Sequence, residues 1–419
     1  MPDCAHTSVR DEILRLQRAH LMPCSANFYE RPPVFVAAED CEMIDIEGRR
    51  YLDMFSGVAV VNAGHCNPDI ARAVDTQMRR LDHTTSIYLS EPLVRLAKRL
   101  AATMPPGLKR SFFCASGSEA NEGALLLAAV HTGRSEVVAM RGALHGRTKA
   151  AMSATGLPMW RWDPAPLPNF HHVACGAEPG AIDELLRAIE RIGPDRVAAV
   201  IAEPVLGNGG IEIPPSQYWP AVRAICDEYG ILLILDEVQT GMNRTGSWWA
   251  AQTCGVTPDV LTTAKALANG YPVAAFVTRD EIAASFTRPY ASTFGGNPVA
   301  AAAALATIDY HQRHDLGGRA RERGAQLLAG VRRLSECYAC LQRPRGVGLM
   351  VAADIVDHDG QADPVRLDAI LESAKDRGVL LGKSGPGRNV LTLLPPLTIS
   401  SAQVETALAV IEEVLRNAT

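Results

Sequence analysis

Six short apolar runs, alternating with segments of helical periodicity, constrain the fold of this 419-residue chain more than any other feature. A strand that is apolar along its whole length must be covered on both faces, and its alternation with helices is typical of a mainly parallel sheet between helical layers. The runs are SFFCA (111–115), VVAM (137–140), VAAVIAE (197–203), ILLILDE (231–237), VLTTAK (260–265) and PVAAFVT (272–278). We therefore expect an α/β fold.

The segments between and beyond these runs predict the helices and the domain organisation. Helical periodicity marks 91–104, 117–132 and 216–230, and VAAAAALAT (299–307) has the high helix propensity of alanine. Residues 30–57 predict strand, turn and strand, with EGRR at the hairpin. Long amphipathic helices (316–337, 364–378 and 401–417) and short strands (348–356 and 389–396) follow the sheet region. We predict an N-terminal lobe (1–59), a large domain (60–310) and a C-terminal part (311–419), the two ends together forming a smaller α+β domain.

Composition excludes several classes of protein. A net charge of −5 without basic clusters gives no reason to expect a nucleic-acid partner, and no apolar run is long enough to span a membrane. The first twenty residues lack the apolar core of a signal peptide, so we expect a cytoplasmic location with the ten cysteines reduced.

No metal site is expected either. Cys337 and Cys340 form a C-x-x-C pair, but no second pair completes a tetrahedral zinc site. His171 and His172 stand in a Pro-rich segment without a carboxylate companion, which we interpret as a loop, and we expect a loop or interface role for the pair.

An acid and an amine are placed at the ends of two of these strands. Asp236 ends ILLILDE, and Lys265 ends VLTTAK before a turn closed by glycine. Such a pair suits pyridoxal 5'-phosphate (PLP): the amine forms a Schiff base with the cofactor, and the carboxylate keeps the pyridine nitrogen protonated. For an isolated pair, a strand cap and a solvated lysine would be the better interpretation.

A Gly-Ser-rich turn between a strand and a helix offers a place for the phosphate of such a cofactor. CASGSEANEG (114–123) puts Ser116, Gly117 and Ser118 at a helix N-terminus, where free N–H groups bind anions. An ordinary capping box explains the same residues nearly as well. ASTFGGNP (291–298) adds the hydroxyl of Thr293 before a Gly-Gly turn.

These motifs together resemble the class-III (ω-aminotransferase) family of fold-type-I PLP enzymes. SGSEAN, HGRT, AEP, LDEVQTG, the lysine and STFGGNP occur in the order of that family, and the resemblance extends from YLDMFSGVAVVNAGHCNPDI (51–70) to GPGRNVLTLLPPLTIS (385–400). The chain looks most like the alanine–glyoxylate aminotransferase 2 group and its phospholyase relatives.

The resemblance implies a role for each matched residue. Lys265 would be the Schiff-base lysine that also moves the substrate proton, and Asp236 the partner of the pyridine nitrogen. Gln239 would bind the phenolic oxygen, Val238 would pack beneath the ring, and Glu203 would hold this polar network. Ser116, Gly117 and Ser118 would bind the phosphate together with Thr293 from the other subunit of a homodimer.

Three positions depart from the family pattern. Leu144 replaces the aromatic residue that stacks on the ring, so Leu144 or the following His145 is expected to cover that face. Thr392 stands where many members carry a carboxylate-binding arginine, and Asn208 replaces the glutamate that pairs with this arginine. Because the guanidinium fork is the best carboxylate ligand, its loss favours a substrate without an α-carboxylate.

Two kinds of reaction remain open. We expect an aminotransferase that moves an amino group between a primary amine, such as an ω-amine or amino sugar, and a small 2-oxo acid. GPGRN (385–389) resembles the phospholyase version of this segment, so a lyase or epimerase acting through the same carbanion is the alternative. Candidate substrate-binding residues are Tyr88, Arg147, Arg161 and Arg388, whose arginines could take over carboxylate binding.

Overall fold

The computed structural model describes residues 8–25 and 27–418. Residues 1–7, with which the predicted N-terminal lobe begins, lie outside the described residues.

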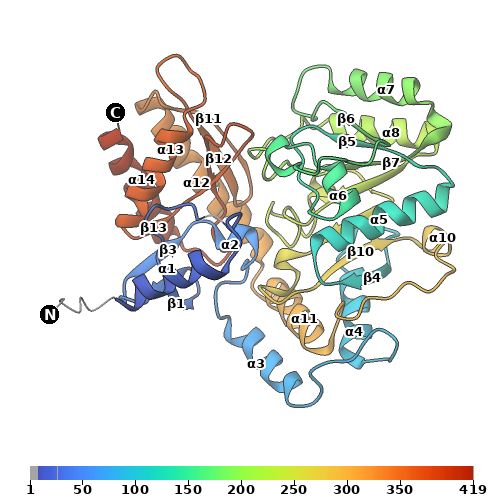
Figure 1. The fold of residues 1–419 in the computed structure, drawn as a ribbon, viewed down its shortest axis with the longest axis horizontal. Coiled ribbons are helices and arrows are strands. Elements are labelled where there is room, and N and C mark those ends of the chain that lie inside the picture. The colour runs from blue at the N-terminus through green and yellow to red at the C-terminus, as the bar shows by residue number, and fades with distance from the viewer. Residues whose placement is uncertain (1–7, 26, 419) are drawn as a thin grey trace.

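A seven-stranded, mainly parallel sheet forms the core of the right-hand body of the molecule in Figure 1, as the apolar runs predict. Its order is β4-β10-β9-β8-β7-β5-β6, and β10 runs antiparallel to both of its neighbours while the remaining pairings are parallel. The strands are β4 (Arg110–Cys114), β5 (Glu136–Met140), β6 (Phe170–Val173), β7 (Val197–Ala202), β8 (Leu232–Asp236), β9 (Val260–Thr263) and β10 (Ala274–Thr278).

Helices cover both faces of this sheet, which explains why its strands are apolar throughout. Along β7, Ala199 and Ile201 point into a core with α5 (Gly117–Thr132), while Val200 and Ala202 point into a core with α7 (Ala181–Ile192) and α8 (Tyr218–Tyr229). Successive side chains of a strand face opposite sides. Each face of the sheet is therefore covered by its own helical layer, and the side chains of β7 point alternately into the two cores.

Strand β6 and helix α7 were not anticipated from the sequence, and the loop interpretation of the histidine pair is wrong. His171 and His172 lie within β6, where His171 Nε2 is 2.7 Å from Glu136 Oε2. Because β6 is an edge strand and pairs only with β5, it tolerates half-buried polar residues. A search for unbroken apolar runs therefore misses it.

The two ends of the chain meet in a second region, where β13 pairs in parallel with β3. The N-terminal segment holds three strands instead of the two expected, because the chain reverses at Asp40 (φ 50°) without a glycine or proline to signal the turn. One sheet contains β1 (Phe35–Glu39), β2 (Glu42–Asp45), β3 (Arg50–Asp53) and β13 (Val379–Leu380), and another contains β11 (Leu341–Val347), β12 (Met350–Ile355), β15 (Val390–Leu393) and β14 (Gly382–Ser384). The predicted domain boundaries stay a prediction.

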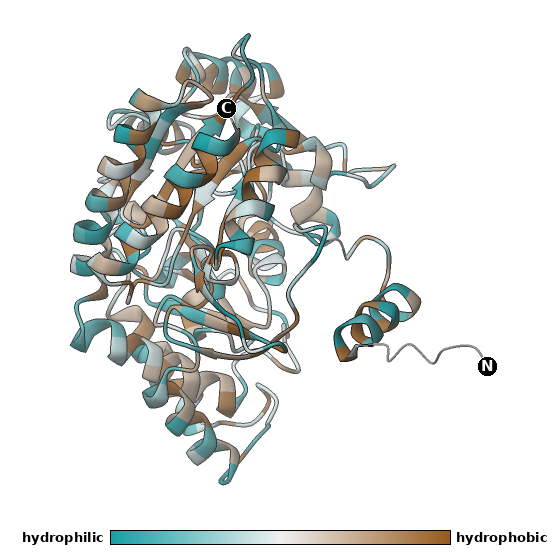
Figure 2. Cartoon of the chain, turned by 90° about the vertical axis from the view of Figure 1, so that its left-hand side faces the viewer, coloured by the Kyte–Doolittle hydropathy of each residue, from teal (hydrophilic) through white to brown (hydrophobic). Residues whose placement is uncertain are grey.

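Helices α12 (Leu316–Cys337) and α13 (Pro364–Asp376) pack on these smaller sheets, and α14 (Ser401–Ala418) packs on α12 and α13 (Figure 1). The other helical elements are α1 (Val9–His20), α2 (Ser56–Ala59), α3 (Pro68–Met78), α4 (Glu91–Ala101), α6 (Lys149–Ala154), α9 (Ala250–Thr253), α10 (Asp280–Ala283), α11 (Pro298–Arg313), and the 3-10 turns η1 (Pro158–Trp160), η2 (Pro194–Arg196) and η3 (Lys265–Ala268). In Figure 2, α1 stands at the margin of the molecule. None of the helices in the described ranges is long and apolar enough to cross a membrane.

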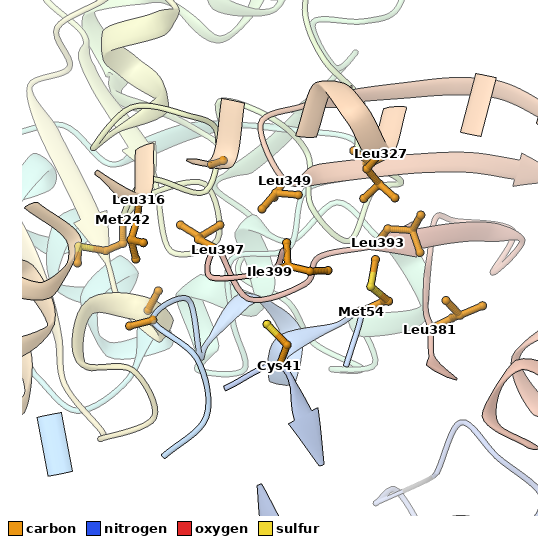
Figure 3. Packing of buried hydrophobic residues seen from close by; sticks show 14 of the residues in the cluster. Cys41, Met54, Met242, Leu316, Leu327, Leu349, Leu381, Leu393, Leu397 and Ile399 are labelled. Carbon is orange, nitrogen blue, oxygen red and sulfur yellow. The ribbon is translucent and has the colours of Figure 1, made fainter. Parts of the chain in front are cut away.

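One apolar core joins the large sheet region to the chain ends. Figure 3 shows Met54 and Cys41 from the N-terminal segment beside Leu349, Leu393 and other side chains from the C-terminal part. The same cluster includes Met242, which follows β8, and Leu316 at the start of α12. The region around the end of β8 therefore shares its core with segments far apart in the sequence.

Candidate active site

A cavity of about 340 Å³ opens at the carboxyl ends of β8 and β9. Parallel strands of an α/β sheet present their carboxyl ends at one edge, where ligands usually bind. The lining residues are Val60, Ala115, Ser116, Gly117, Ser118, Asn121, Leu144, His145, Gly146, Asp236, Val238, Ala264, Lys265, Gly270, Tyr271, Pro272 and Val273. The volume lies within the range of small-molecule sites.

The N-terminus of α5 forms one wall of this cavity and carries a complete capping box. Glu119 N donates to Ser116 Oγ, and Glu119 Oε2 accepts from the backbone N–H groups of Ala115 and Ser116. Among the hydrogen bonds of the described residues, none uses the N–H groups of Gly117 and Ser118. The capping box and an anion site are therefore compatible, since the box leaves two donors free at the positive end of the helix.

Gly146 lets the loop after β5 approach this helix terminus. Its φ of 144° is unfavourable for other residues, and a Cβ atom there would lie 2.5 Å from Ser118 Oγ. The next residue, Arg147, donates its backbone N–H to Ser118 Oγ at 3.0 Å. This contact places Leu144 and His145 beside the cavity.

Asp236, the last residue of β8, is buried and held by three donors. Its Oδ2 accepts from Asn121 Nδ2 at 2.7 Å and lies 2.8 Å from His145 Nδ1, and its Oδ1 accepts from Val238 N at 3.0 Å. Asn121 also donates to the His145 carbonyl and accepts from Thr262 Oγ1. The carboxylate is thus fixed in position at the cavity wall.

Asn121 was missed as a site residue. It stands four residues after Gly117 in SGSEAN, so both lie on the same face of α5, toward the sheet. That spacing was the available signal.

Lys265 follows β9 at the start of η3 and adopts a left-handed backbone conformation with φ 42°. Non-glycine residues rarely adopt this conformation, and such strain clusters at functional sites. The side chain is partly exposed because it lines the cavity. Desolvation lowers the pKa of Lys265, while the charges of Glu203 and Asp236 oppose this shift. The lowered pKa increases the fraction of neutral, nucleophilic amine.

Glu203 binds the backbone of the loop that carries Leu144, and both of its carboxyl oxygens accept hydrogen bonds. Oε1 accepts from Leu144 N and Oε2 accepts from Gly207 N, each at 2.8 Å. Burial and the nearby charge of Asp236 raise the pKa of Glu203. Gln239 is also buried, and its Oε1 has no hydrogen-bond partner among the described residues.

The remaining predicted residues lie away from the lining of the cavity. Thr293 is exposed in the segment before α11. The candidate substrate residues Tyr88, Arg147 and Arg388 are exposed and Arg161 is half-buried, and none of them lines the cavity. Their roles stay predictions.

Thr392, the predicted replacement of a carboxylate-binding arginine, lies within a sheet and not in the lining of the cavity. Thr392 is buried on β15, and its Oγ1 lies 2.6 Å from Ser384 Oγ and donates to the Val390 carbonyl. Asn208 instead uses its backbone carbonyl, which accepts from Gly385 N at 2.9 Å.

The arginine nearest in register to Thr392 is engaged elsewhere. Arg345 shares a cross-strand row with Thr392, because both pair with Ala352 of β12. Its guanidinium donates to the Gly210 carbonyl and forms an ion pair with Asp354 at 2.8 Å. The guanidinium of Arg345 is therefore not free to bind a substrate carboxylate in place of the arginine that is absent at Thr392.

Comparison with known proteins identifies the family. The chain matches the family described as aminotransferase class-III over residues 25–415. It is 38% identical to an acetylornithine aminotransferase of Methanothermobacter thermautotrophicus over 97% of this chain and 98% of the relative. It is also 37% identical to alanine–glyoxylate aminotransferase 2 homolog 2, mitochondrial, of Arabidopsis thaliana over 92% of this chain and 83% of the relative.

Solved structures agree with this assignment. An amine transaminase from an uncultivated Pseudomonas species, solved in its PLP-bound form, superposes with a TM-score of 0.89 at 31% identity, covering 96% of this chain and 98% of that one. The family and this neighbour imply PLP as the cofactor. The chain belongs to the class-III aminotransferases.

Proposed function

We propose that this aminotransferase holds PLP in the cavity at the end of β8 and moves an amino group between a primary amine that lacks an α-carboxylate and a small 2-oxo acid. The single observation that carries the substrate class is Thr392, whose buried hydroxyl is bonded within its own sheet where many relatives carry a carboxylate-binding arginine.

The residues of the cavity fit this cofactor. The free N–H groups of Gly117 and Ser118 suit a phosphate, and Ser116 and Ser118 add hydroxyl groups. Val238 and Leu144 supply apolar surface for the two faces of a ring. In this proposal, Gln239 binds the phenolic oxygen and Glu203 supports the loop that carries Leu144.

Bound PLP supplies an electron sink for the negative charge that develops at the substrate carbon. Lys265, with its lowered pKa, would take the proton from that carbon and deliver it to carbon C4' of the cofactor. Asp236 keeps a proton on the pyridine nitrogen, while Asn121 and His145 hold the carboxylate in place. The buried surroundings strengthen this electrostatic effect.

The protein is proposed to act in the cytoplasm as a homodimer whose sites are completed across the subunit interface. Thr293 is exposed in the single chain, as expected of a residue that contacts the phosphate of the other subunit. Two-fold dimers are also the commonest oligomers.

The experiment is a single-turnover half-reaction with a panel of amines and amino acids. We expect an amine without a carboxylate to bleach the absorbance of the PLP-loaded protein and to generate the pyridoxamine form. Lys265→Ala should abolish the conversion of the PLP form into the pyridoxamine form. If no amine or amino acid produces the change, the proposed function is wrong.

A second candidate is transamination of an amino acid, because the Methanothermobacter relative is an acetylornithine aminotransferase. In that case Arg147, Arg161 or Arg388 would bind the carboxylate. Acetylornithine in the same panel separates the candidates, since the second predicts that it outcompetes simple amines. The phospholyase-like GPGRN segment also motivates an assay for ammonia and phosphate release, which a transaminase does not produce.

A further inference from the structure

The segment α2 winds in the left-handed sense over four consecutive residues. The φ angles are 45° at Ser56, 62° at Gly57, 68° at Val58 and 58° at Ala59. Left-handed backbone is unfavourable for residues other than glycine, and Val58 is β-branched, which makes it a rare exception. Such a segment persists only when its surroundings enforce it.

This left-handed turn leads directly into the cavity. Val60 N donates to the Ser56 carbonyl at 2.8 Å, which fixes Val60 relative to the start of the turn. Val60 is the first residue after α2, and it lines the cavity. The conformation of α2 therefore sets the position of one cavity wall.

Arg244 forms hydrogen bonds with the first residue of the left-handed turn and with Asn62, three residues after the turn ends. Its Nη2 donates to Ser56 Oγ at 3.3 Å and to Asn62 Oδ1. Its Nη1 donates to the carbonyls of Leu349 at 3.0 Å and Pro395 at 2.6 Å. One side chain thus ties the loop after β8 to the turn and to two segments of the C-terminal part.

The cost of burying Arg244 argues that these contacts matter. The side chain is fully buried, and no carboxylate forms an ion pair with it among the described residues. Burial lowers the pKa of Arg244 to about 9. Met242, Leu349 and Met54 belong to the apolar core in this region (Figure 3). Buried charges are usually paired. Here the four hydrogen bonds of the guanidinium and the charge of Asp53 offset its burial, while Arg244 Nε has no hydrogen-bond partner among the described residues.

We propose that Arg244 is a positioning residue of the active site, which holds α2 in its left-handed conformation and so places Val60 against the substrate. The proposal rests on the proposed function for the identity of the cavity. Arg244 does not line the cavity, and it acts through the turn.

The first test is hydrogen exchange of the apoprotein, which needs no cofactor. In Arg244→Met and the milder Arg244→Lys, we expect the amides of residues 58–61 to exchange at least about tenfold faster than in the wild type. Arg134→Met is the matched control, because Arg134 Nη1 also donates to backbone carbonyls, those of Pro194, Val197, Tyr229 and Gly230. The control should lose stability without faster exchange at 58–61.

The second test is kinetic and uses the PLP-loaded enzyme. Arg244→Lys should raise KM for the amine roughly tenfold with a smaller change in kcat, because the chemical groups stay in place. Val58→Gly should partly restore KM in the Arg244→Lys background, since glycine removes the strain that the arginine holds.

Two outcomes would overturn the proposal. One is that both Arg244 variants lose stability as Arg134→Met does, with unchanged exchange at 58–61 and unchanged KM. The other is that Val58→Gly fails to rescue KM. An inactive wild-type enzyme would contradict the proposed function instead, and the exchange experiment would still decide the role of Arg244.

Discussion

At the scale of single residues, the structure contains a buried acid outside the cavity that couples stability to pH. Glu237 follows Asp236, is fully buried, and accepts from Thr240 Oγ1 and from the backbone N–H groups of Ala250 and Ala251. Burial raises the pKa of Glu237 from 4.5 to about 7. The folded state therefore binds this proton more tightly than the unfolded state does.

The sign of the effect follows from this shift. As pH rises from 4.5 through about 7, the unfolded state releases the proton first, so the folded state loses stability over that window. We expect Glu237 to reduce the unfolding free energy of the apoprotein by about 3 kcal/mol between pH 4.5 and 8. A shift of one pKa unit corresponds to about 1.4 kcal/mol. Urea unfolding at several pH values measures the loss. Glu237→Gln should flatten the profile, and an equally steep profile in that variant would contradict the prediction.

Asn121 carries the second prediction at this scale. Asn121→Ala removes one of the donors to Asp236 Oδ2 and leaves Thr262 Oγ1 without its acceptor. We expect the variant to lose about 1–3 kcal/mol of the stabilisation that its hydrogen bonds give to Asp236. If this loss appears in the transition state, kcat falls roughly tenfold to a hundredfold. Steady-state kinetics checks this. Asn67→Ala is the control, because Asn67 is also buried and caps α3. If both variants keep full kcat, Asn121 does not position Asp236.

At the scale of elements, α5 packs against β10 at a glycine. A Cβ atom on Gly123 would lie 2.4 Å from the ring of Phe276, which stacks on Phe112. Helix propensity alone favours alanine by about 1 kcal/mol, but overpacking a core costs about 1–3 kcal/mol. We therefore expect Gly123→Ala to lower the melting temperature, and calorimetry measures it. Phe276→Leu in the same background should recover part of the loss; a Gly123→Ala protein that is more stable than the wild type would contradict the clash.

The left-handed turn is the other element in which local preference is overridden. Each of its three non-glycine residues costs about 1–2 kcal/mol in this conformation. The hydrogen bonds of Asp53 Oδ1 to the N–H groups of Phe55 and Ser56, both at 2.8 Å, and those of Arg244 offset this cost. Asp53 is a local partner, but Arg244 lies 188 residues from Ser56, so the local sequence supplies only part of this stabilisation.

At the scale of the whole molecule, ion pairs connect the loop after β7 to the C-terminal sheet. Arg343 and Arg345 both approach Glu212, and both pair with Asp354. The loop that carries Asn208 is thereby fixed against the sheet that carries Thr392. Separate parts of the chain thus meet between the loop after β7 and the C-terminal sheet.

The proposed homodimer yields a complementation prediction. If Thr293 acts on the phosphate of the other subunit, co-expression of Lys265→Ala and Thr293→Ala chains gives mixed dimers with one intact site. We expect PLP affinity and activity to return to about half of the wild-type level in purified mixed dimers, whereas either variant by itself is impaired. Mixed dimers without recovery would place Thr293 in its own subunit's site, or outside any site.

The sequence by itself determined the α/β class, the family and the positions along the chain of the main strands of the large sheet. Periodicity and motif order are local properties of the chain, which is why they suffice for these features. It also pointed to Asp236, Lys265 and the α5 terminus, which lie at the ends of such local elements. It did not reveal β6, whose edge position tolerates His171 and His172.

Only the tertiary structure decided how the site is assembled. Asn121 meets Asp236, and Arg244 meets Ser56, across more than a hundred residues of sequence. The N–H groups of Gly117 and Ser118 stay free because the side chain of Glu119 occupies the neighbouring N–H groups of Ala115 and Ser116. Such pairings depend on burial, which lets a distant hydrogen bond override local backbone preference, and no short stretch of sequence encodes them.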